Sequence, residues 1–251
     1  MESCGRDIFN RVELLTGSDA MERIARSRVI LFGIGGVGSW TAEALVRSGI
    51  GHLTIVDADN VACTNINRQL MATHSTVGMP KTEALRERLL DINPEASVTC
   101  VTGIYSEETS GEFDFDSYDY VIDAIDSLAH KATLILNACR SKARLFSSMG
   151  AARKMDPTRI AVAEFWKVKG CPLAAALRRR FKRGGVMPRK KFRCVYSDEL
   201  VPNSGESESA SDTSGTMTYG KIAVNGALCH ITAIFGMMLA GLVIEDICKK
   251  G

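Results

Sequence analysis

The sequence predicts an α/β protein with a doubly wound, mostly parallel sheet and a C-terminal extension. Short apolar runs alternate with segments of helical periodicity as far as about residue 150, and a glycine-rich turn joins the first run to the first helical segment. The chain has 251 residues, of which 45% are hydrophobic and 24% charged, which fits one soluble domain or a domain with an appended lobe. Intrinsic disorder and a small disulfide scaffold are thereby excluded.

The first section of the chain reads as a series of βαβ units. Glycines and β-branched residues mark the strands, apolar positions at helical spacing mark the helices, and Asn93-Pro94 ends one helix. A crossover helix returns the chain to the same edge of the sheet, so the strands that it joins are parallel and the connection is right-handed. Strands are expected at 28–33, 53–57, 97–101, 120–124 and 145–148, and helices at 39–48, 81–91 and 129–142. We therefore expect residues 1–150 to form one domain.

The second section, residues 151–251, differs in composition and charge. A strand is expected at about 159–168, a strongly basic segment spans 165–197, and residues 202–218, rich in Ser, Gly, Thr and acids, are expected to form a mobile loop. Residues 222–244 carry no formal charge and are long enough to cross a bilayer. Since a doubly wound sheet needs apolar helices on both faces, we interpret them as a helix buried in the core or at a subunit interface, with peripheral membrane association left open.

The eight cysteines indicate neither structural zinc nor dithiol chemistry. The closest two, Cys229 and Cys248, stand 19 positions apart, so the sequence contains no CxxC pair. The stretch Met1–Asn10 contains no apolar run of the kind that directs secretion. Together with unpaired thiols, this predicts a cytoplasmic protein.

A glycine-rich motif lies where the first predicted strand becomes a helix. Gly33, Gly35, Gly36 and Gly38 fit the pattern GxGxxG, and Asp57 ends the following strand. Glycines allow a tight turn and close approach of a phosphate, the helix N-terminus presents free N–H groups to an anion, and the carboxylate can bond ribose hydroxyls. This context predicts a Rossmann-like nucleotide-binding fold, for which NAD and a dehydrogenase would be the default.

The residues after Asp57 favour ATP over NAD. A triphosphate places negative charge beyond the glycine turn, where Arg and Lys side chains would need to reach it. Asp123 and Asp126 follow a predicted central strand, at the end where ligands of open α/β sheets bind, and a carboxylate beside a triphosphate is a natural Mg²⁺ ligand. Asp123 could equally be a helix cap. The other candidates are Asp59, Asn65, Arg68, Gln69 and Lys81. Jointly these residues predict a Rossmann-like ATP-binding fold that uses Mg²⁺.

Several motifs resemble the ubiquitin-activating-like superfamily that includes ThiF, MoeB and HesA. They are GIGGVGS at 33–39, DADNV, TNINRQ, Lys81 and DAIDS, in matching order over roughly residues 6–150. DPT at 156–158 and CVYSDE at 194–199 extend the likeness to most of the chain. Within the superfamily the sequence looks most like the branch of tRNA threonylcarbamoyladenosine dehydratases.

The resemblance implies a role for each matching position. Gly35 would hold the α-phosphate side of ATP, Asp57 the ribose, and Lys81 the β- and γ-phosphates. Asp126 would bind Mg²⁺, and Arg11 would reach the ATP site of a neighbouring subunit, so that a homodimer is expected. The full expected ATP set is Gly33, Gly35, Gly36, Gly38, Asp57, Asp59, Asn65, Arg68, Gln69, Lys81, Asp123 and Ser127, and the expected catalytic set is Arg11, Arg68, Lys81 and Asp126.

The resemblance also implies an ATP-dependent, ligase-type activity. A carboxylate would attack the α-phosphate of ATP to give an acyl adenylate and pyrophosphate. In the dehydratase branch that carboxylate belongs to threonylcarbamoyladenosine in tRNA, which then cyclises with loss of water. The alternative is an adenylyltransferase that activates the C-terminus of a ubiquitin-like sulfur carrier, although MoeB-type members carry two CxxC pairs that this sequence lacks. A nucleotide-binding module without catalysis is a third reading, and a sulfur-transfer protein stays open as a partner.

The basic segment at 165–197 indicates a polyanionic partner. It holds eleven of the 31 Lys and Arg and none of the 29 Asp and Glu, so the rest of the chain is acidic. Phosphate contacts by the cations, with a base stacked on Phe181, Phe192 or Tyr196, would suit tRNA. A solvated face or a disordered charged block is the alternative. The cations expected to contact tRNA are Arg178, Arg179, Arg180, Lys182, Arg183, Lys190 and Lys191.

Overall fold

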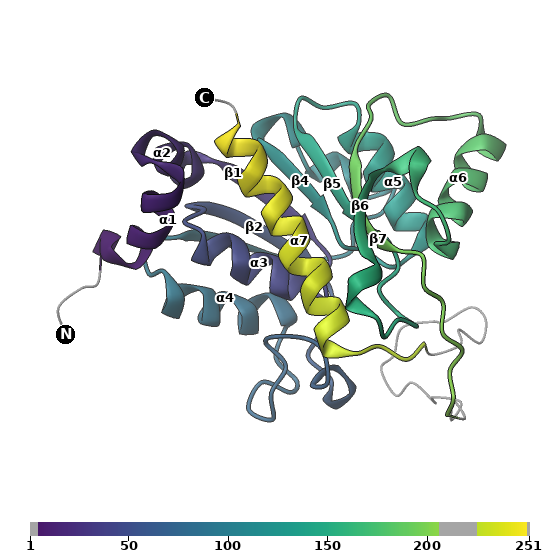
Figure 1. Ribbon diagram of the computed structural model, residues 1–251, viewed down its shortest axis with the longest axis horizontal. Coiled ribbons are helices and arrows are strands. Elements are labelled where there is room, and N and C mark those ends of the chain that lie inside the picture. Colours follow the sequence, from purple (N-terminus) through teal and green to yellow (C-terminus); the bar gives the residue numbers. More distant parts are fainter. Residues whose placement is uncertain (1–4, 206–224, 250–251) are drawn as a thin grey trace.

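Seven strands form one sheet at the centre of the computed structural model, which describes residues 5–205 and 225–249 (Figure 1). Their order is β3-β2-β1-β4-β5-β7-β6, and every neighbouring pair is parallel except β6 with β7. The strands are β1 (Arg28–Phe32), β2 (His52–Asp57), β3 (Ser97–Thr102), β4 (Tyr120–Asp123), β5 (Arg144–Ser148), β6 (Ile160–Glu164) and β7 (Arg193–Ser197). The predicted doubly wound, mostly parallel α/β sheet is confirmed.

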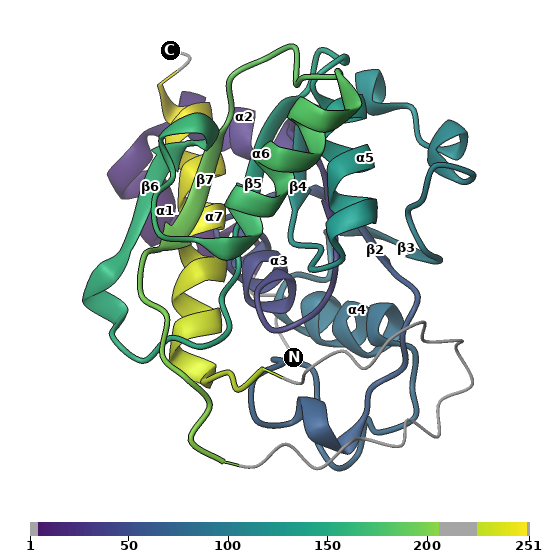
Figure 2. The same ribbon diagram turned by 90° about the vertical axis from the view of Figure 1, so that its right-hand side faces the viewer.

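Helices cover both faces of this sheet (Figures 1 and 2): α2, α3, α4 and α7 pack on one face, and α5 and α6 on the other. In β1, Val29 and Leu31 belong to the first of these two cores, whereas Ile30 and Phe32 belong to the second. Since successive side chains of a strand point to opposite faces, a strand covered on both sides needs an unbroken apolar run. The helices are α1 (Asn10–Thr16), α2 (Ser18–Arg26), α3 (Gly38–Arg47), α4 (Lys81–Ile92), α5 (Leu128–Ala138), α6 (Pro172–Gly184) and α7 (Cys229–Cys248).

The strands and helices expected before residue 150 are all present, with ends that move by a few residues. The largest shift is in α5, which ends at Ala138 rather than near 142. α1 and α2 were not predicted. The expected strand at 159–168 ends at Glu164 and passes into a 3-10 turn. Residues 206–218 of the expected mobile loop lie outside the described residues.

The basic segment is folded into the sheet rather than forming a disordered block. It supplies α6 and then β7, which was not predicted and which lies between β5 and β6. The sheet therefore takes strands from both sections of the chain. The division at residue 150 stays a prediction.

α7 is the buried apolar helix that the uncharged stretch predicted, although it begins at Cys229 rather than at 222. By length and composition it could cross a membrane, but more than half of its apolar window is buried inside the protein, as in the core helix of a soluble protein. Gly236 brings it close to α3, since a Cβ there would lie 2.5 Å from the carbonyl oxygen of Val37. The hydroxyl of Thr41 donates to the carbonyl of Gly236 at 3.2 Å across this contact. Residues 222–224 lie outside the described residues.

The core position of α7 predicts different costs for two truncations on the same helix. Phe235 is fully buried, so Phe235→Ala should lower the free energy of unfolding by about 3–5 kcal/mol. Met237 is 45% exposed, so Met237→Ala should cost about 0.5 kcal/mol or less. Urea denaturation followed by circular dichroism measures both. Equal costs at the two positions would contradict the assignment of α7 to the core.

Candidate active site

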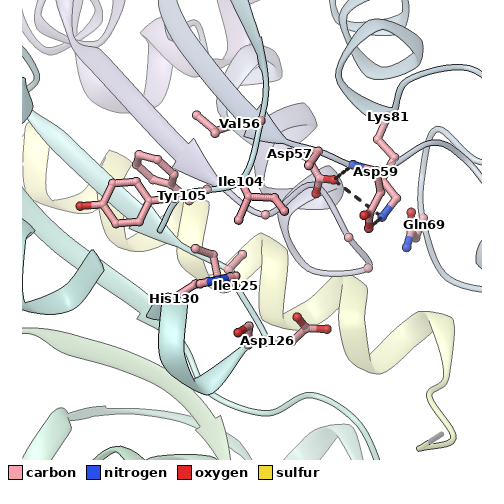
Figure 3. A pocket seen from close by; sticks show the side chains of 18 of the residues that line it. Val56, Asp57, Asp59, Gln69, Lys81, Ile104, Tyr105, Ile125, Asp126 and His130 are labelled. Carbon is pink, nitrogen blue, oxygen red and sulfur yellow. Dashed lines mark hydrogen bonds and ion pairs between the residues drawn. The ribbon is translucent and has the colours of Figure 1, made fainter. Parts of the chain in front are cut away.

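A cavity of about 410 Å³ opens at the carboxyl ends of β1, β2 and β4 (Figure 3). The chain leaves β1 toward β2 on one side, whereas β4 lies on the other side of β1. This is the point at which the strand order reverses, where open α/β sheets bind their ligands. The cavity collects the glycine turn after β1, the segment after β2, the start of α4 and the loops that follow β3 and β4.

The glycine turn needs glycine for two different reasons. Gly33 has φ +87°, and a Cβ there would lie 2.7 Å from the carbonyl oxygen of Ala124 in the loop after β4. At Gly38 a Cβ would lie 1.8 Å from the carbonyl oxygen of Gly33. Gly35 and Gly36 line the cavity, and Gly33 does so as well. Gly38 is outside the lining and lets the turn fold back on itself, and its expected contact with the nucleotide stays a prediction.

Two carboxylates and a buried lysine meet beside the turn (Figure 3). The Nζ of Lys81 lies 2.6 Å from Oδ2 of Asp59 and 3.8 Å from Oδ1 of Asp57. Asp57 also accepts the backbone N–H of Ile34 at 2.6 Å, which fixes its carboxylate against the glycine turn. Burial raises the pKa of the Asp57 carboxyl, and the nearby ammonium of Lys81 opposes that rise. The site thus holds a lysine that is only 6% exposed at the edge of an open cavity.

The segment after β2 brings three more predicted residues to the cavity, namely Asn65, Arg68 and Gln69. The guanidinium of Arg68 donates to the carbonyl of Thr64 at 2.9 Å. Gln69 is buried, and its Oε1 has no hydrogen-bond partner among the described residues. A buried amide oxygen without a partner at a cavity wall is costly unless a ligand or water supplies a donor. This orphaned group fits a cavity that holds a polar ligand.

A buried ion pair lies beneath the loop after β4. Asp123 and Lys131 are both fully buried, with Oδ2 and Nζ 2.8 Å apart, and the hydroxyl of Ser147 donates to the same carboxylate at 2.6 Å. Burial raises the pKa of the Asp123 carboxyl, and the ammonium of Lys131 opposes this effect. Asp123 does not line the cavity, so its expected direct contact with the nucleotide is wrong. The carboxylate points into the core because its positive partner is there.

The same pair fixes the loop that does line the cavity. The N–H of Ile125 donates to Asp123 at 3.1 Å, and the carbonyl of Ile125 accepts from Lys131 at 2.8 Å. Both backbone polar groups of Ile125 are therefore held by side chains of opposite charge. Asp126 and Ser127 follow it directly, and both line the cavity as predicted.

Sequence reasoning missed the apolar wall of the cavity. Val56, Ile104, Tyr105 and Ile125 line it, and His130 lies beside Ile125 (Figure 3). Ile104 lines the cavity and is 49% exposed, so it lies at the open side of the site. Only their position at or just after the ends of β2, β3 and β4 could have indicated the apolar residues. An apolar residue in a loop carries no chemical signature.

Arg11 lies on α1, away from the cavity of its own chain. α1 packs on α2, and Arg23 of α2 donates to the carbonyl of Ile247 near the end of α7. At the other end of α7, Thr232 lies next to Gly36 of the glycine turn. About 22 Å of helix separates these two ends at 1.5 Å per residue. A role for Arg11 in ATP binding is therefore left only in the site of a neighbouring subunit.

The basic segment contains cations with structural roles as well as exposed ones. The guanidinium of Arg178 donates to the carbonyls of Phe165 and Val168 at 3.0 and 2.8 Å. Phe181 and Phe192 are 2% and 4% exposed and pack in the core around Phe165, so their expected stacking on a base is wrong. Tyr196, on β7, is half-buried against the same core.

Three exposed arginines of the segment line an open groove between α5 and α6. They are Arg179, Arg180 and Arg183, and the floor of the groove includes Leu128, Leu136 and Val186. Lys182 and Lys191 are also exposed, whereas the ammonium of Lys190 donates to the carbonyls of Ser141 and Ala143. The fold thus divides the predicted tRNA-binding set into groove residues, other surface cations and residues tied to backbone.

The strand order, the glycine turn and the switch-point cavity define a nucleotide-binding α/β protein. The buried Lys81 and the Arg68 that lines the same cavity suit a ligand with more phosphate than a dinucleotide. The model of the ThiF family matches residues 9–251. The chain belongs to the ThiF family.

Relatives of known function are similar over nearly the whole chain. The tRNA threonylcarbamoyladenosine dehydratases of Bacillus subtilis and Escherichia coli are each 37% identical, covering 96% and 98% of this chain and 94% and 95% of their own lengths. The crystal structure of the E. coli enzyme TcdA in complex with ATP matches with a TM-score of 0.86 at 36% identity, over 99% of this chain and 96% of that one. The E. coli molybdopterin-synthase adenylyltransferase is 33% identical over 78% of this chain and 75% of its own. The branch that the motifs indicated is confirmed.

The buried ion pair gives a test of how the loop after β4 is held. Lys131→Met should lower the free energy of unfolding by about 3–5 kcal/mol, because it leaves the Asp123 carboxylate buried without its partner. The double variant with Asp123→Asn removes that charge and should be more stable than the single variant. Urea denaturation of both measures the difference. A double variant that is less stable than Lys131→Met would show that the orphaned charge is not the cause.

Proposed function

We propose that this protein uses ATP to dehydrate threonylcarbamoyladenosine in tRNA to its cyclic form. The observation that carries the proposal is the nearly full-length similarity to dehydratases, combined with a cavity whose residues match the needs of ATP. The bacterial relatives are enzymes of that name, and the ATP complex of the E. coli enzyme has the same fold. We therefore assign the protein an ATP-dependent, tRNA-modifying activity.

The cavity offers a place for each part of ATP. The apolar wall at Val56, Ile104 and Ile125 suits an adenine ring, and Asp57 is placed to accept hydrogen bonds from ribose hydroxyls. The triphosphate would run past the N-terminus of α3 toward Lys81. Asp59, whose side chain is 71% exposed, can release Lys81 when phosphate oxygens take its place.

A magnesium ion would be held jointly by the protein and by ATP. Asp126 is exposed at the cavity, and no described residue pairs with it. Among the described residues no group of three or more His, Cys, Asp or Glu could hold a metal alone. This fits Mg²⁺, which binds through one or two carboxylates together with substrate phosphates. When bound, the ion would offset the charge of the leaving pyrophosphate.

The reaction has two steps. An oxygen of the threonyl carboxylate attacks the α-phosphorus of ATP, a new P–O bond forms, and the bond to the bridging oxygen breaks as pyrophosphate leaves. The carbamoyl group then attacks the activated carbonyl carbon and gives up a proton, and AMP leaves with the former carboxylate oxygen, so that the substrate loses one water. Lys81 and Arg68 would neutralise the phosphates, because the barrier of the first step comes from bringing anions together.

Two surface features support a homodimer in which Arg11 serves the partner's site. Arg11 is exposed and away from its own cavity. On the same short helix, Leu14 and Leu15 are 80% and 87% exposed. Exposed leucines on a helix without a buried residue gain stability when a second copy covers them.

A sulfur-carrier adenylyltransferase remains the second candidate, favoured only by the 33% identity to the molybdopterin-synthase enzyme.

Release of pyrophosphate tests the proposed reaction. We expect ATP-dependent release with tRNA that carries threonylcarbamoyladenosine, and a modified nucleoside that is lighter by one water in mass spectrometry. Lys81→Met should lower kcat/KM by about 10²–10³-fold, because a cation that balances the triphosphate is lost. Lys169→Met, a matched change at an exposed lysine outside the cavity, should have no effect. Release with a sulfur-carrier protein instead of tRNA would overturn the proposal.

The groove on α6 should contribute to tRNA affinity. Replacing Arg179, Arg180 and Arg183 together by Ala should raise Kd for tRNA about 10- to 100-fold and reduce the slope of log K against log salt by about 2–3, since each lost phosphate contact removes about 0.9. The KM for ATP should stay unchanged. Fluorescence anisotropy at several salt concentrations gives Kd for tRNA and the salt slope, with Lys169→Ala as the control. An unaltered salt slope would remove the groove from the RNA surface.

A further inference from the structure

A second cavity of about 410 Å³ lies at the opposite edge of the sheet from the ATP cavity. It is lined by residues at the amino ends of β5 and β7 and by the end of the segment that runs from α6 back to β7. Figure 2 shows the course of that segment. Its floor is apolar and includes Phe146 and Phe192. Five cations line it, namely Lys142, Arg144, Lys190, Lys191 and Arg193, against two acids, Glu164 and Asp246. The cavity is therefore strongly basic.

The fold, rather than the sequence, gathers these cations. Lys142 comes from the turn between α5 and β5, and Arg144 begins β5, both outside the basic segment. Lys190 and Lys191 come from the segment before β7. Some of the cations are engaged: Arg144 pairs with Asp246, and Arg193 lies over the ring of Phe146. No described residue pairs with the ammonium groups of Lys142 and Lys191, so these two are available to an anion.

The two available lysines stand on anchored backbone. The N–H of Lys142 donates to the carboxylate of Asp116 at 2.5 Å. The side chain of Lys190 donates to the carbonyls of Ser141 and Ala143, which ties the segment before Lys191 to the turn that carries Lys142. Bringing several like charges into one cavity is unfavourable unless an anion lies between them. A preformed cavity of this kind suits phosphate groups.

α5 connects the second cavity to the ATP cavity. Ser127 and His130 at its beginning line the ATP cavity, and Leu128 and Leu136 line the arginine groove with α6. Cys139, directly after the helix, lines the second cavity. The helix is 11 residues long, about 16 Å, so the three features follow one another along its length.

We infer that the second cavity binds backbone phosphates of the RNA substrate, at a distance from the nucleotide that reacts. This inference rests on the proposed function. The charge complementarity favours a long polyanion, because an RNA strand whose modified base enters the ATP cavity would pass the arginines of α6 and reach Lys142 and Lys191. A single small anion would occupy only one of these places. The distal contacts would hold the RNA in one direction along α5.

The test is a charge reversal at the two available lysines. Lys142→Glu combined with Lys191→Glu should raise Kd for full-length tRNA about 10- to 100-fold and reduce the salt slope by about 2. KM for tRNA should rise, while kcat at saturating tRNA and KM for ATP stay unchanged. Lys169→Glu, in the same basic segment but outside the second cavity and the arginine groove, is the matched control. It should change neither Kd for tRNA nor the salt slope. Thermal melting shows that each variant is folded.

The outcomes separate this inference from the proposed function. Wild-type protein that neither binds tRNA nor releases pyrophosphate with it would overturn the function. If the α6 variant weakens tRNA binding but the Lys142 and Lys191 variant does not, only the inference fails. It also fails if inorganic phosphate binds the wild type, is lost in the double variant, and tRNA affinity is the same in both. A short hairpin that keeps the anticodon loop but lacks the distal stem should bind wild type and double variant equally.

Discussion

The close contact between the glycine turn and the loop after β4 is the constraint on which the site depends. Gly33 lies against the backbone of Ala124, and Gly38 folds back against Gly33, with no room for a side chain at either position. The Asp123–Lys131 pair holds the same loop from the core side. Two backbone segments from different βαβ units are thereby fixed against each other at the switch point. The opening that remains faces Lys81 and Asp57, which is where the charges of the site collect.

The sequence predicted most elements because their apolar patterns are unambiguous, and it failed where identical residues have different environments. A carboxylate at the end of β4 looks the same in the sequence whether it faces an open cavity, as Asp126 does, or a buried lysine, as Asp123 does. The arginines of the basic segment are also indistinguishable in the sequence, although Arg178 donates hydrogen bonds to backbone carbonyls and Arg179 lies in an open groove. α6 could have been found, since Ala174, Leu177 and Phe181 recur at helical spacing and form its buried stripe. The cavities depend on how the elements pack, and no pattern in the sequence indicates them.

The distribution of charge assigns separate tasks to separate faces. The cavity proposed for ATP lies at the carboxyl edge of the sheet, within a chain that is acidic outside one segment. The exposed cations of that segment follow α6 and the approach to β7, beside α5, which starts at this cavity. A polyanion would be repelled by most of the surface and attracted along this one path. The net charge of +2 is therefore the sum of a basic segment and an acidic remainder, and neither part is close to neutral.

The order in which the chain supplies its elements has a consequence for synthesis. α7 comes after every strand in the chain, yet it covers one face of the sheet, where it packs on α3 and β5. Likewise β6 cannot join the sheet until β7, made later, has paired with β5. A nascent chain that ends before α7 therefore exposes the apolar surface that α7 covers, and one that ends before β7 also leaves the parallel edge of β5 unpaired. Folding of this domain must wait for residues 229–248 to leave the ribosome, and a chaperone has its longest opportunity to act before that moment.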